Sequence, residues 1–111
     1  MVSDITVDEH AICLMNKGII YEEMNRSKDA IVCYLHAIKI FVQLYENKPI
    51  EYGKIINAMF TLGHCNYKNR LFDKAQETLQ STLQYFGEGK ENDRRYIAIC
   101  NTLEELSNIE N

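Results

Sequence analysis

Residues 14–41 read LMNKGIIYEEMNRSKDAIVCYLHAIKIF, and residues 59–86 read MFTLGHCNYKNRLFDKAQETLQSTLQYF. The two stretches align without a gap at an offset of 45 residues, with small residues on small and large on large. The aligned pairs are Gly18 with Gly63, Ala30 with Ala75, Tyr34 with Leu79, Ile38 with Leu83 and Phe41 with Phe86. One constant offset of this kind predicts a stack of structural repeats.

The bulk composition is that of one ordinary globular domain. The chain has 111 residues, of which 46% are hydrophobic and 25% are charged, and it holds a single proline. The net charge of -4 is spread evenly, because residues 1–55 and 56–111 each carry six basic and eight acidic side chains. Since no basic stripe appears, we expect neither nucleic acid nor a membrane as a partner.

Cysteine use and the start of the sequence bear on the compartment. Cys13, Cys33, Cys65 and Cys100 lie among apolar neighbours, and no C-x-x-C motif occurs. Residues 1–4, MVSD, lack the positive lead and apolar run of a secretory leader. No apolar run is long enough to span a membrane. We therefore expect a cytoplasmic protein with reduced thiols.

Apolar spacing and capping residues predict five helices. The first runs over about residues 6–24, with Thr6 or Ser3 as N-cap, and Ser27 is the N-cap of the second. The third starts at Pro49, and the fourth continues through Phe86 until the glycines at 87 and 89 break it. Asn92 or Asp93 caps a fifth helix, which resembles the third at an offset of 44. The single domain thus divides into repeat 1 (about 6–46), repeat 2 (about 49–87) and a capping helix (about 92–109).

The order of residues within each copy resembles that of the tetratricopeptide repeat (TPR), a helix–turn–helix unit of 34 residues. The positions that carry the resemblance are Gly18, Tyr21, Ala30, Tyr34 and Ala37 in the first copy and Gly63, Ala75 and Leu79 in the second. Small residues at these positions let two helices approach closely, and the large ones fill the space beside them. The resemblance implies an all-α fold, a right-handed TPR-like superhelix of antiparallel helices.

The repeat here is 11 residues longer than the family's, which advances a helix about 20° past three full turns. Longer helices therefore keep the same packing face. In this respect the chain resembles the long-helix repeats of kinesin light chains and of the intracellular peptide-pheromone receptors of Gram-positive bacteria.

The resemblance implies a concave groove lined by the first helix of each pair. The implied groove positions are Ile12, Met15, Ile19 and Glu22, then Asn57, Phe60, His64, Tyr67 and Lys68, then Asn101, Glu104 and Asn108. Asn57 and Asn101 are the strongest candidates for ligand binding, because a side-chain amide can hydrogen-bond to a peptide backbone as donor or as acceptor. The alternative is that both amides face solvent without a specific role.

Phe60, His64 and Tyr67 share one helix face. They form either an aromatic platform for a ligand or simply part of the core.

Metal and enzyme chemistry have little support in the sequence. His10 with Cys13, and Cys33 with His36, could each offer two ligands from one helical turn, but a site would need both pairs to converge. The usual nucleophile, phosphate-loop and zinc motifs are absent from the sequence. We expect no catalysis, no metal and no cofactor.

The fifth helix carries an apolar run at residues 96–100, YIAIC, which wraps more than one helix face. The helix either caps the stack or meets another copy through its spare apolar surface. The sequence therefore predicts a non-enzymatic module that binds a peptide or protein segment in its groove, as a monomer or a homodimer. The alternative is a self-assembling helical scaffold that uses the fifth helix or the convex face.

Overall fold

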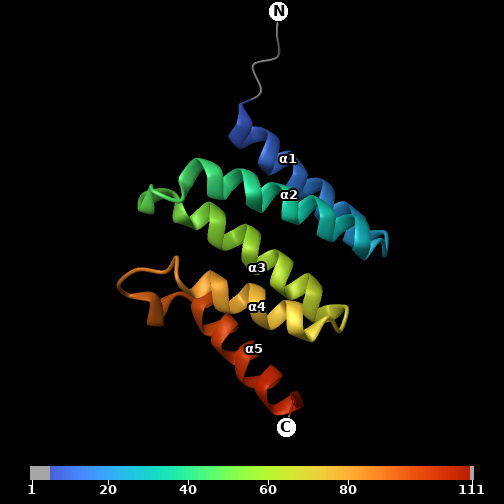
Figure 1. The fold of residues 1–111 in the computed structure, drawn as a ribbon, viewed down its shortest axis with the longest axis vertical. Coiled ribbons are helices and arrows are strands. Elements are labelled where there is room, and N and C mark those ends of the chain that lie inside the picture. The colour runs from blue at the N-terminus through green and yellow to red at the C-terminus, as the bar shows by residue number, and fades with distance from the viewer. Residues whose placement is uncertain (1–5, 111) are drawn as a thin grey trace, which may run out of the picture.

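The computed structural model of the chain describes residues 6–110, in which the regular elements are helices and no strand occurs. Five α-helices, α1 to α5, and two short 3₁₀ segments, η1 and η2, follow one another along the chain (Figure 1). The prediction of an all-helical fold with five helices is confirmed. The two predictions for the first residues, Ser3 as a cap and the missing leader, concern residues outside the described range. The elements are α1 (Val7–Glu23), α2 (Ser27–Tyr45), η1 (Pro49–Glu51), α3 (Tyr52–Lys68), α4 (Phe72–Leu83), η2 (Lys90–Asn92) and α5 (Arg94–Glu110).

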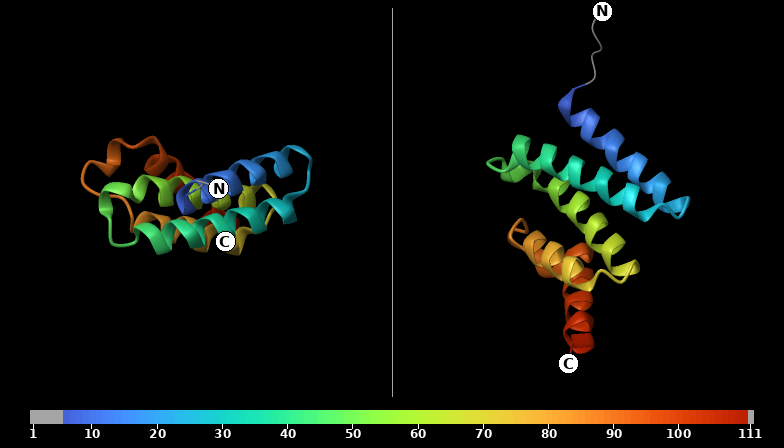
Figure 2. Two further views of the ribbon diagram at one scale, coloured as in Figure 1. Left: turned by 90° about the horizontal axis from the view of Figure 1, so that it is seen from above. Right: turned by 45° about the vertical axis from the view of Figure 1, so that its right-hand side comes forward.

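The helices lie side by side in chain order, and each packs on the next. The turns α1–α2 and α3–α4 lie at one edge of the molecule, and the longer connections through η1 and η2 lie at the other (Figure 1). The molecule measures 57 × 36 × 19 Å. A thickness of 19 Å accommodates two layers of helices, since one helix with side chains is about 10 Å across. Seen from above, α1 and α3 lie on one side and α2 and α4 on the other (Figure 2).

The repeat seen in the sequence recurs in the backbone. Helices α1 and α3 begin and end at positions that are 45 residues apart. Each is followed, two residues after its end, by a left-handed residue, Asn25 with φ of 60° and Arg70 with φ of 62°, again 45 residues apart. The same two hydrogen bonds close each turn, in the pattern of a Schellman motif. In the first copy the N–H of Arg26 donates to Tyr21 O (2.8 Å) and the N–H of Asn25 to Glu22 O (3.0 Å). In the second copy the N–H of Leu71 donates to Asn66 O (2.9 Å) and the N–H of Arg70 to Tyr67 O (3.0 Å).

The aligned small residues mark the points where helices cross. A Cβ placed on Gly18 would come within 2.8 Å of Cδ1 of the Tyr34 ring, and one placed on Gly63 within 2.8 Å of Leu79 Cγ. Tyr34 and Leu79 are fully buried. Each glycine of the first helix thus faces the large residue that its own copy supplies from the second helix. The other aligned small residues, Ala30, Ala37 and Ala75, are also fully buried.

Helix α3 lies at the centre of the core. One cluster joins Ala11, Phe41 and Ile55 of α1, α2 and α3, and another joins Tyr34 of α2 to Leu62 and Cys65 of α3. Helix α5 buries Ile99 and Leu106. Tyr21, which the resemblance assigns to space filling, is half-buried beside the second cluster, and Lys17 and Arg26 lie over its ring.

Three helix ends differ from the expectation. Ser27 is the first residue of α2 and not its N-cap, because the turn that closes α1 already places the Arg26 carbonyl to accept from the N–H of Ala30. Pro49 begins η1, and α3 itself starts at Tyr52. Helix α4 ends at Leu83 and is 12 residues long against 19 for α2.

Two predicted caps are confirmed. The Thr6 hydroxyl accepts from the N–H of Glu9 at 3.0 Å, and an Asp93 carboxylate oxygen accepts from the N–H of Arg95 at 2.8 Å. Both are side-chain acceptors for the otherwise unpaired N–H groups of a first helical turn.

Candidate functional site

A groove of about 280 Å³ runs between α1 and α3. Helix α1 contributes Ile12, Met15 and Ile19 to one wall, and Phe41 of α2 is part of the lining. Ile12 and Ile19 are 43% and 44% exposed, so these two apolar side chains remain open to a ligand. The other wall is formed by α3 residues Lys54, Asn57, Ala58 and Thr61. Four of the predicted groove positions, Ile12, Met15, Ile19 and Asn57, therefore do line one groove.

Two ion pairs tie α1 to α3. Lys54 Nζ lies 3.3 Å from Asp8 Oδ1, and Lys68 Nζ lies 2.9 Å from Glu22 Oε2. In each pair the lysine follows the acid by 46 residues, and the two pairs are 14 residues apart along their helices. This separation is about 21 Å at 1.5 Å per residue. Apart from Lys54 itself, the groove-lining residues of α1 and α3 fall between the two pairs, so the spacing of the two helices is set at both ends of the groove.

The Asp8 end of the groove is a small hydrogen-bonded cluster. The Tyr45 hydroxyl donates to Asp8 Oδ1 at 2.6 Å, and Lys54 also lies 3.1 Å from Glu51 Oε2. The hydrogen bond from Tyr45, helped by Lys54, lowers the pKa of Asp8 although burial opposes the change. The hydrogen bond to Glu51 is the largest cause of the raised pKa of Lys54. Both groups are therefore charged at neutral pH.

The Glu22 end is more buried. Burial alone would raise the pKa of Glu22, but hydrogen bonds from Tyr34 and Lys68 outweigh it and lower that pKa. The hydroxyl of Tyr34 donates to Glu22 Oε1. Burial, and then the same hydrogen bond, raise the pKa of Tyr34. Glu22 thus accepts from α2 and α3 at once and holds three helices together.

Asn57 is held in one orientation by α5. Its Oδ1 accepts from a guanidinium nitrogen of Arg95 at 2.7 Å, and Arg95 is itself paired with Asp93 at 2.9 Å. Because the amide oxygen is used in this way, the Nδ2 group is left as the donor that can face a ligand. Thr61 donates its hydroxyl to the Asn57 carbonyl at 2.8 Å, which leaves the Thr61 oxygen able to accept.

The aromatic residues predicted on α3 pack mainly within the protein. The Phe60 and His64 rings meet edge to face at a centroid distance of 4.4 Å. Burial, followed by the charge of Lys68, lowers the pKa of His64, whose Nε2 is buried without a hydrogen-bond partner among residues 6–110. The Tyr67 hydroxyl donates to Glu105 Oε2 at 2.7 Å. Phe60, His64 and Tyr67 do not line the groove between α1 and α3, and Lys68 pairs with Glu22.

Neighbours on α5 do not follow the predicted alignment. The two hydrogen bonds between α3 and α5, Asn57 with Arg95 and Tyr67 with Glu105, each join residues 38 apart. The sequence aligned Asn57 with Asn101 at an offset of 44. Asn101 and Glu104 are exposed on α5 and are not part of the groove lining. The structure therefore places Arg95, and not Asn101, beside Asn57.

The residue pairs weighed as metal ligands come together in part. The His10 and His36 rings lie 5.7 Å apart across α1 and α2. Within residues 6–110, however, no three His, Cys, Asp or Glu side chains are grouped so that they could hold a metal ion. The four cysteines are unpaired thiols, and burial raises the pKa of Cys65 to about 11. None of the helices between residues 6 and 110 has the length and apolar character that crossing a membrane requires.

Phe41 and Lys54 line the groove, although no sequence pattern marks either residue as a groove position. One signal was available for the ion pairs, because Asp8 and Glu22 each fall one position before a lysine when the first copy is laid on the second. Helices that lie side by side with that register bring these charges together.

No protein-family model matches the chain, and a search of curated proteins finds no match to its sequence.

Proposed function

We propose that the chain is a small, non-enzymatic repeat module of TPR type, a short right-handed superhelix, whose role is to bind a peptide or protein segment. The binding site is the groove between α1 and α3. The observation that carries the proposal is the open apolar wall of α1, where Ile12 and Ile19 are each more than two-fifths exposed beside the groove. Ordered grooves with apolar walls and a few placed polar groups are the usual form of ligand sites.

The two walls differ in a way that suits an extended segment. Apolar side chains of the segment would lie against Ile12, Met15 and Ile19 on α1. Its backbone would face α3, where Asn57 offers N–H donors and Thr61 offers an acceptor. Since a peptide backbone presents one donor and one acceptor per residue, this pair of groups can satisfy both. At the Asp8 end, two carboxylates, Asp8 and Glu51, surround the one ammonium of Lys54, which favours a segment with a basic residue there.

The test uses peptides selected on the wild-type protein from a random display library. Ile19→Asp places a charge in the groove, whereas Ile20→Asp, on the next residue of the same helix, places one outside it. Ile19 is 44% exposed and Ile20 54%, so both variants should fold equally well. We expect Ile19→Asp to weaken peptide binding at least tenfold, or about 1.4 kcal/mol, and Ile20→Asp to leave it within about twofold. Equal affinity of both variants would remove the groove assignment.

A self-assembling scaffold is the second candidate, and one observation favours it. Ile97 lies within the apolar run of α5 and is 46% exposed, whereas Ile99 of the same run is fully buried. Exposed apolar surface of this kind can meet a second copy. If α5 is that contact surface, Ile97→Asp will abolish association in sedimentation experiments. Unchanged association of this variant would exclude α5.

A further inference from the structure

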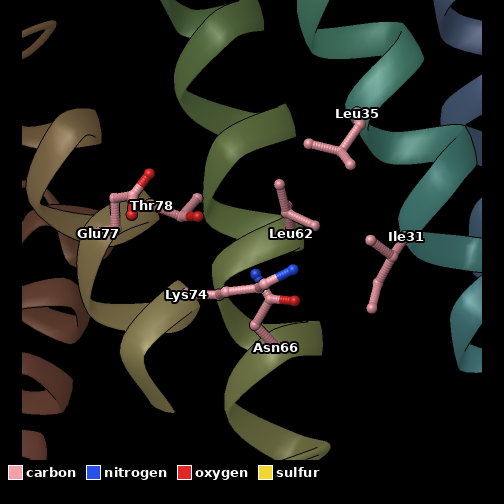
Figure 3. A pocket seen from close by; sticks show the side chains of 7 residues that line it. All are labelled: Ile31, Leu35, Leu62, Asn66, Lys74, Glu77 and Thr78. Atoms are coloured by element: carbon pink, nitrogen blue, oxygen red, sulfur yellow. The ribbon is translucent and has the colours of Figure 1, made fainter. Parts of the chain in front are cut away.

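A second hollow lies on the other layer of the molecule, between α2 and α4. It has a volume of about 240 Å³ and is lined by α2, α3 and α4, as Figure 3 shows. Ile31 and Leu35 form its α2 wall, and Leu62 of α3 adds to the apolar surface between the walls. Leu35 is 52% exposed, so this apolar wall is open to solvent. We refer to this hollow, lined by Ile31, Leu35, Leu62, Asn66, Lys74, Glu77 and Thr78, as the α2–α4 cleft.

The cleft contains a buried amide that has no partner. Asn66 is 3% exposed, and its Oδ1 has no hydrogen-bond partner among residues 6–110. An unpaired buried acceptor costs about 1–3 kcal/mol, so a ligand that supplies a donor is favoured there. In Figure 3 the Lys74 side chain extends from α4 toward Asn66. Lys74 is exposed, so a ligand can displace its side chain and reach the amide.

One segment of the chain matches this cleft. Ile50, in the 3₁₀ segment η1, is 93% exposed, more than the other large apolar residues of residues 6–110. The N–H of Ile50 has no backbone acceptor in the described part of the chain, whereas its neighbour Glu51 donates to Lys48 O at 2.8 Å. Ile50 therefore presents an apolar side chain, which can pack on the apolar walls of the cleft, and a free N–H donor, which can pair with the Oδ1 of Asn66.

We propose that Ile50 of one copy inserts into the α2–α4 cleft of a second copy of this chain. Charge supports the fit, because Lys48, two residues before Ile50, can pair with Glu77 of the cleft, and neither makes an ion pair within residues 6–110. Insertion into the cleft of the same molecule is excluded by distance. Helix α3 starts two residues after Ile50, and Asn66 lies 14 residues further along this rigid helix, about 21 Å away.

The contact joins two different surfaces, so it is heterologous. Such contacts add copies in one direction and produce either a ring or an open chain of molecules. A contact of one loop with one cleft is small, and interfaces of this size are weak and transient. We therefore expect association in the range of about 10 µM to 1 mM. This surface is separate from the groove between α1 and α3, so either assignment can fail without the other.

The test is sedimentation of the full chain and of three variants over that concentration range. Ile50→Asp removes the inserted side chain, and Leu35→Asp, on an exposed residue of the cleft wall, blocks the receiving surface. We expect the wild type to exceed its monomer mass of 12.9 kDa with rising concentration, and each of these variants to stay monomeric. Ile20→Asp is the matched control, since Ile20 is 54% exposed on α1 and lines neither site. It should associate like the wild type.

Mixing the two defective variants gives the decisive result. Ile50→Asp keeps an intact cleft, and Leu35→Asp keeps an intact Ile50, so the 1:1 mixture can make one contact and no more. We expect a heterodimer of twice the monomer mass that does not grow further. The proposal is overturned if the wild type is monomeric throughout, if Ile50→Asp associates like the wild type, or if the mixture stays monomeric. Loss of association in Ile97→Asp but not in Ile50→Asp would instead locate the contact on α5 and would also overturn it.

Discussion

Replacing Gly18 with alanine tests whether the aligned small residues are true helix crossings. The new Cβ would lie within 2.8 Å of the Tyr34 ring, which is fully buried and tied to Glu22 by its hydroxyl. Overpacking of this kind costs about 1–3 kcal/mol. We expect a cost near the upper value, because the Tyr34 ring is fixed by the backbone at one end and by its hydrogen bond to Glu22 at the other. Alanine regains about 1 kcal/mol of helix propensity over glycine. The expected net loss is therefore about 2 kcal/mol.

The assay is urea unfolding followed by helical circular dichroism, with the free energy of unfolding compared between variants. Gly53→Ala is the matched control, because Gly53 lies in α3 and a Cβ there meets nothing within 4 Å. It should gain up to about 1 kcal/mol. In the background of Tyr34→Ala the Gly18→Ala change loses its clash and should become stabilising as well. If Gly18→Ala is as stable as the wild type, or its effect does not depend on Tyr34, the crossing has been assigned to the wrong residues.

Three further predictions follow from particular contacts. The pKa of Glu22 is lowered in the folded state, so its stabilisation is present above the unfolded pKa of about 4.5 and is lost as pH falls through the lower folded value. Glu22→Gln should therefore have a lower free energy of unfolding than the wild type at pH 7. Unfolding measured from pH 7 to pH 3 should show this difference shrinking, and a constant difference would contradict the argument. Arg70→Gly relieves a side chain held at φ of 62° and should raise the free energy of unfolding by about 0.5–1 kcal/mol, measured by thermal melts; a lower melting temperature would refute the strain. A double-mutant cycle of Asn57→Ala and Arg95→Ala should give a coupling of about 0.5–1 kcal/mol, and one of Asn57→Ala and Asn101→Ala a coupling near zero; the reverse order would restore the alignment read from the sequence.

Side-chain size was enough to predict the packing within each copy. A glycine that faces a large residue leaves a pattern in sequence, and the same offset of 45 places Gly63 against Leu79 just as it places Gly18 against Tyr34. The turn after α1 was predictable for a different reason, because asparagine readily adopts the left-handed backbone conformation that Asn25 has there. Arg70 does so in the second copy because the turn is fixed by its hydrogen bonds, which its own residue type would not indicate.

The position of α5 beside α3 could not be predicted, because apolar spacing does not determine how far one helix is shifted along its neighbour. The residues of α3 and α5 that touch are 38 apart and the aligned ones are 44 apart, so the two offsets differ by six residues, or about 9 Å along the helix axis. At the offset of 44, the buried residues Ile99, Thr102 and Leu106 align with buried residues of α3, so the burial pattern gives no sign of the shift. The length of α4, 12 residues and not 19, decides where α5 begins relative to α3. That length depends on where the helix ends in space, which apolar spacing does not determine.

The charged contacts across α1 and α3 were missed for a related reason. Asp8 and Lys54 are 46 residues apart, and surface charges at such a distance give no signal until the two helices are known to be neighbours. Once α1 and α3 are known to be neighbours, the same separation of 46 residues accounts for both ion pairs, and the groove is the space between these pairs.

The most direct test of the groove is chemical-shift mapping on ¹⁵N-labelled protein titrated with a peptide selected on the wild type. We predict that the largest shifts fall on Ile12, Met15 and Ile19 of α1 and on Asn57 and Thr61 of α3. Shifts confined to Ile31, Leu35 and Leu62 on the opposite layer, or to α5, would contradict the account.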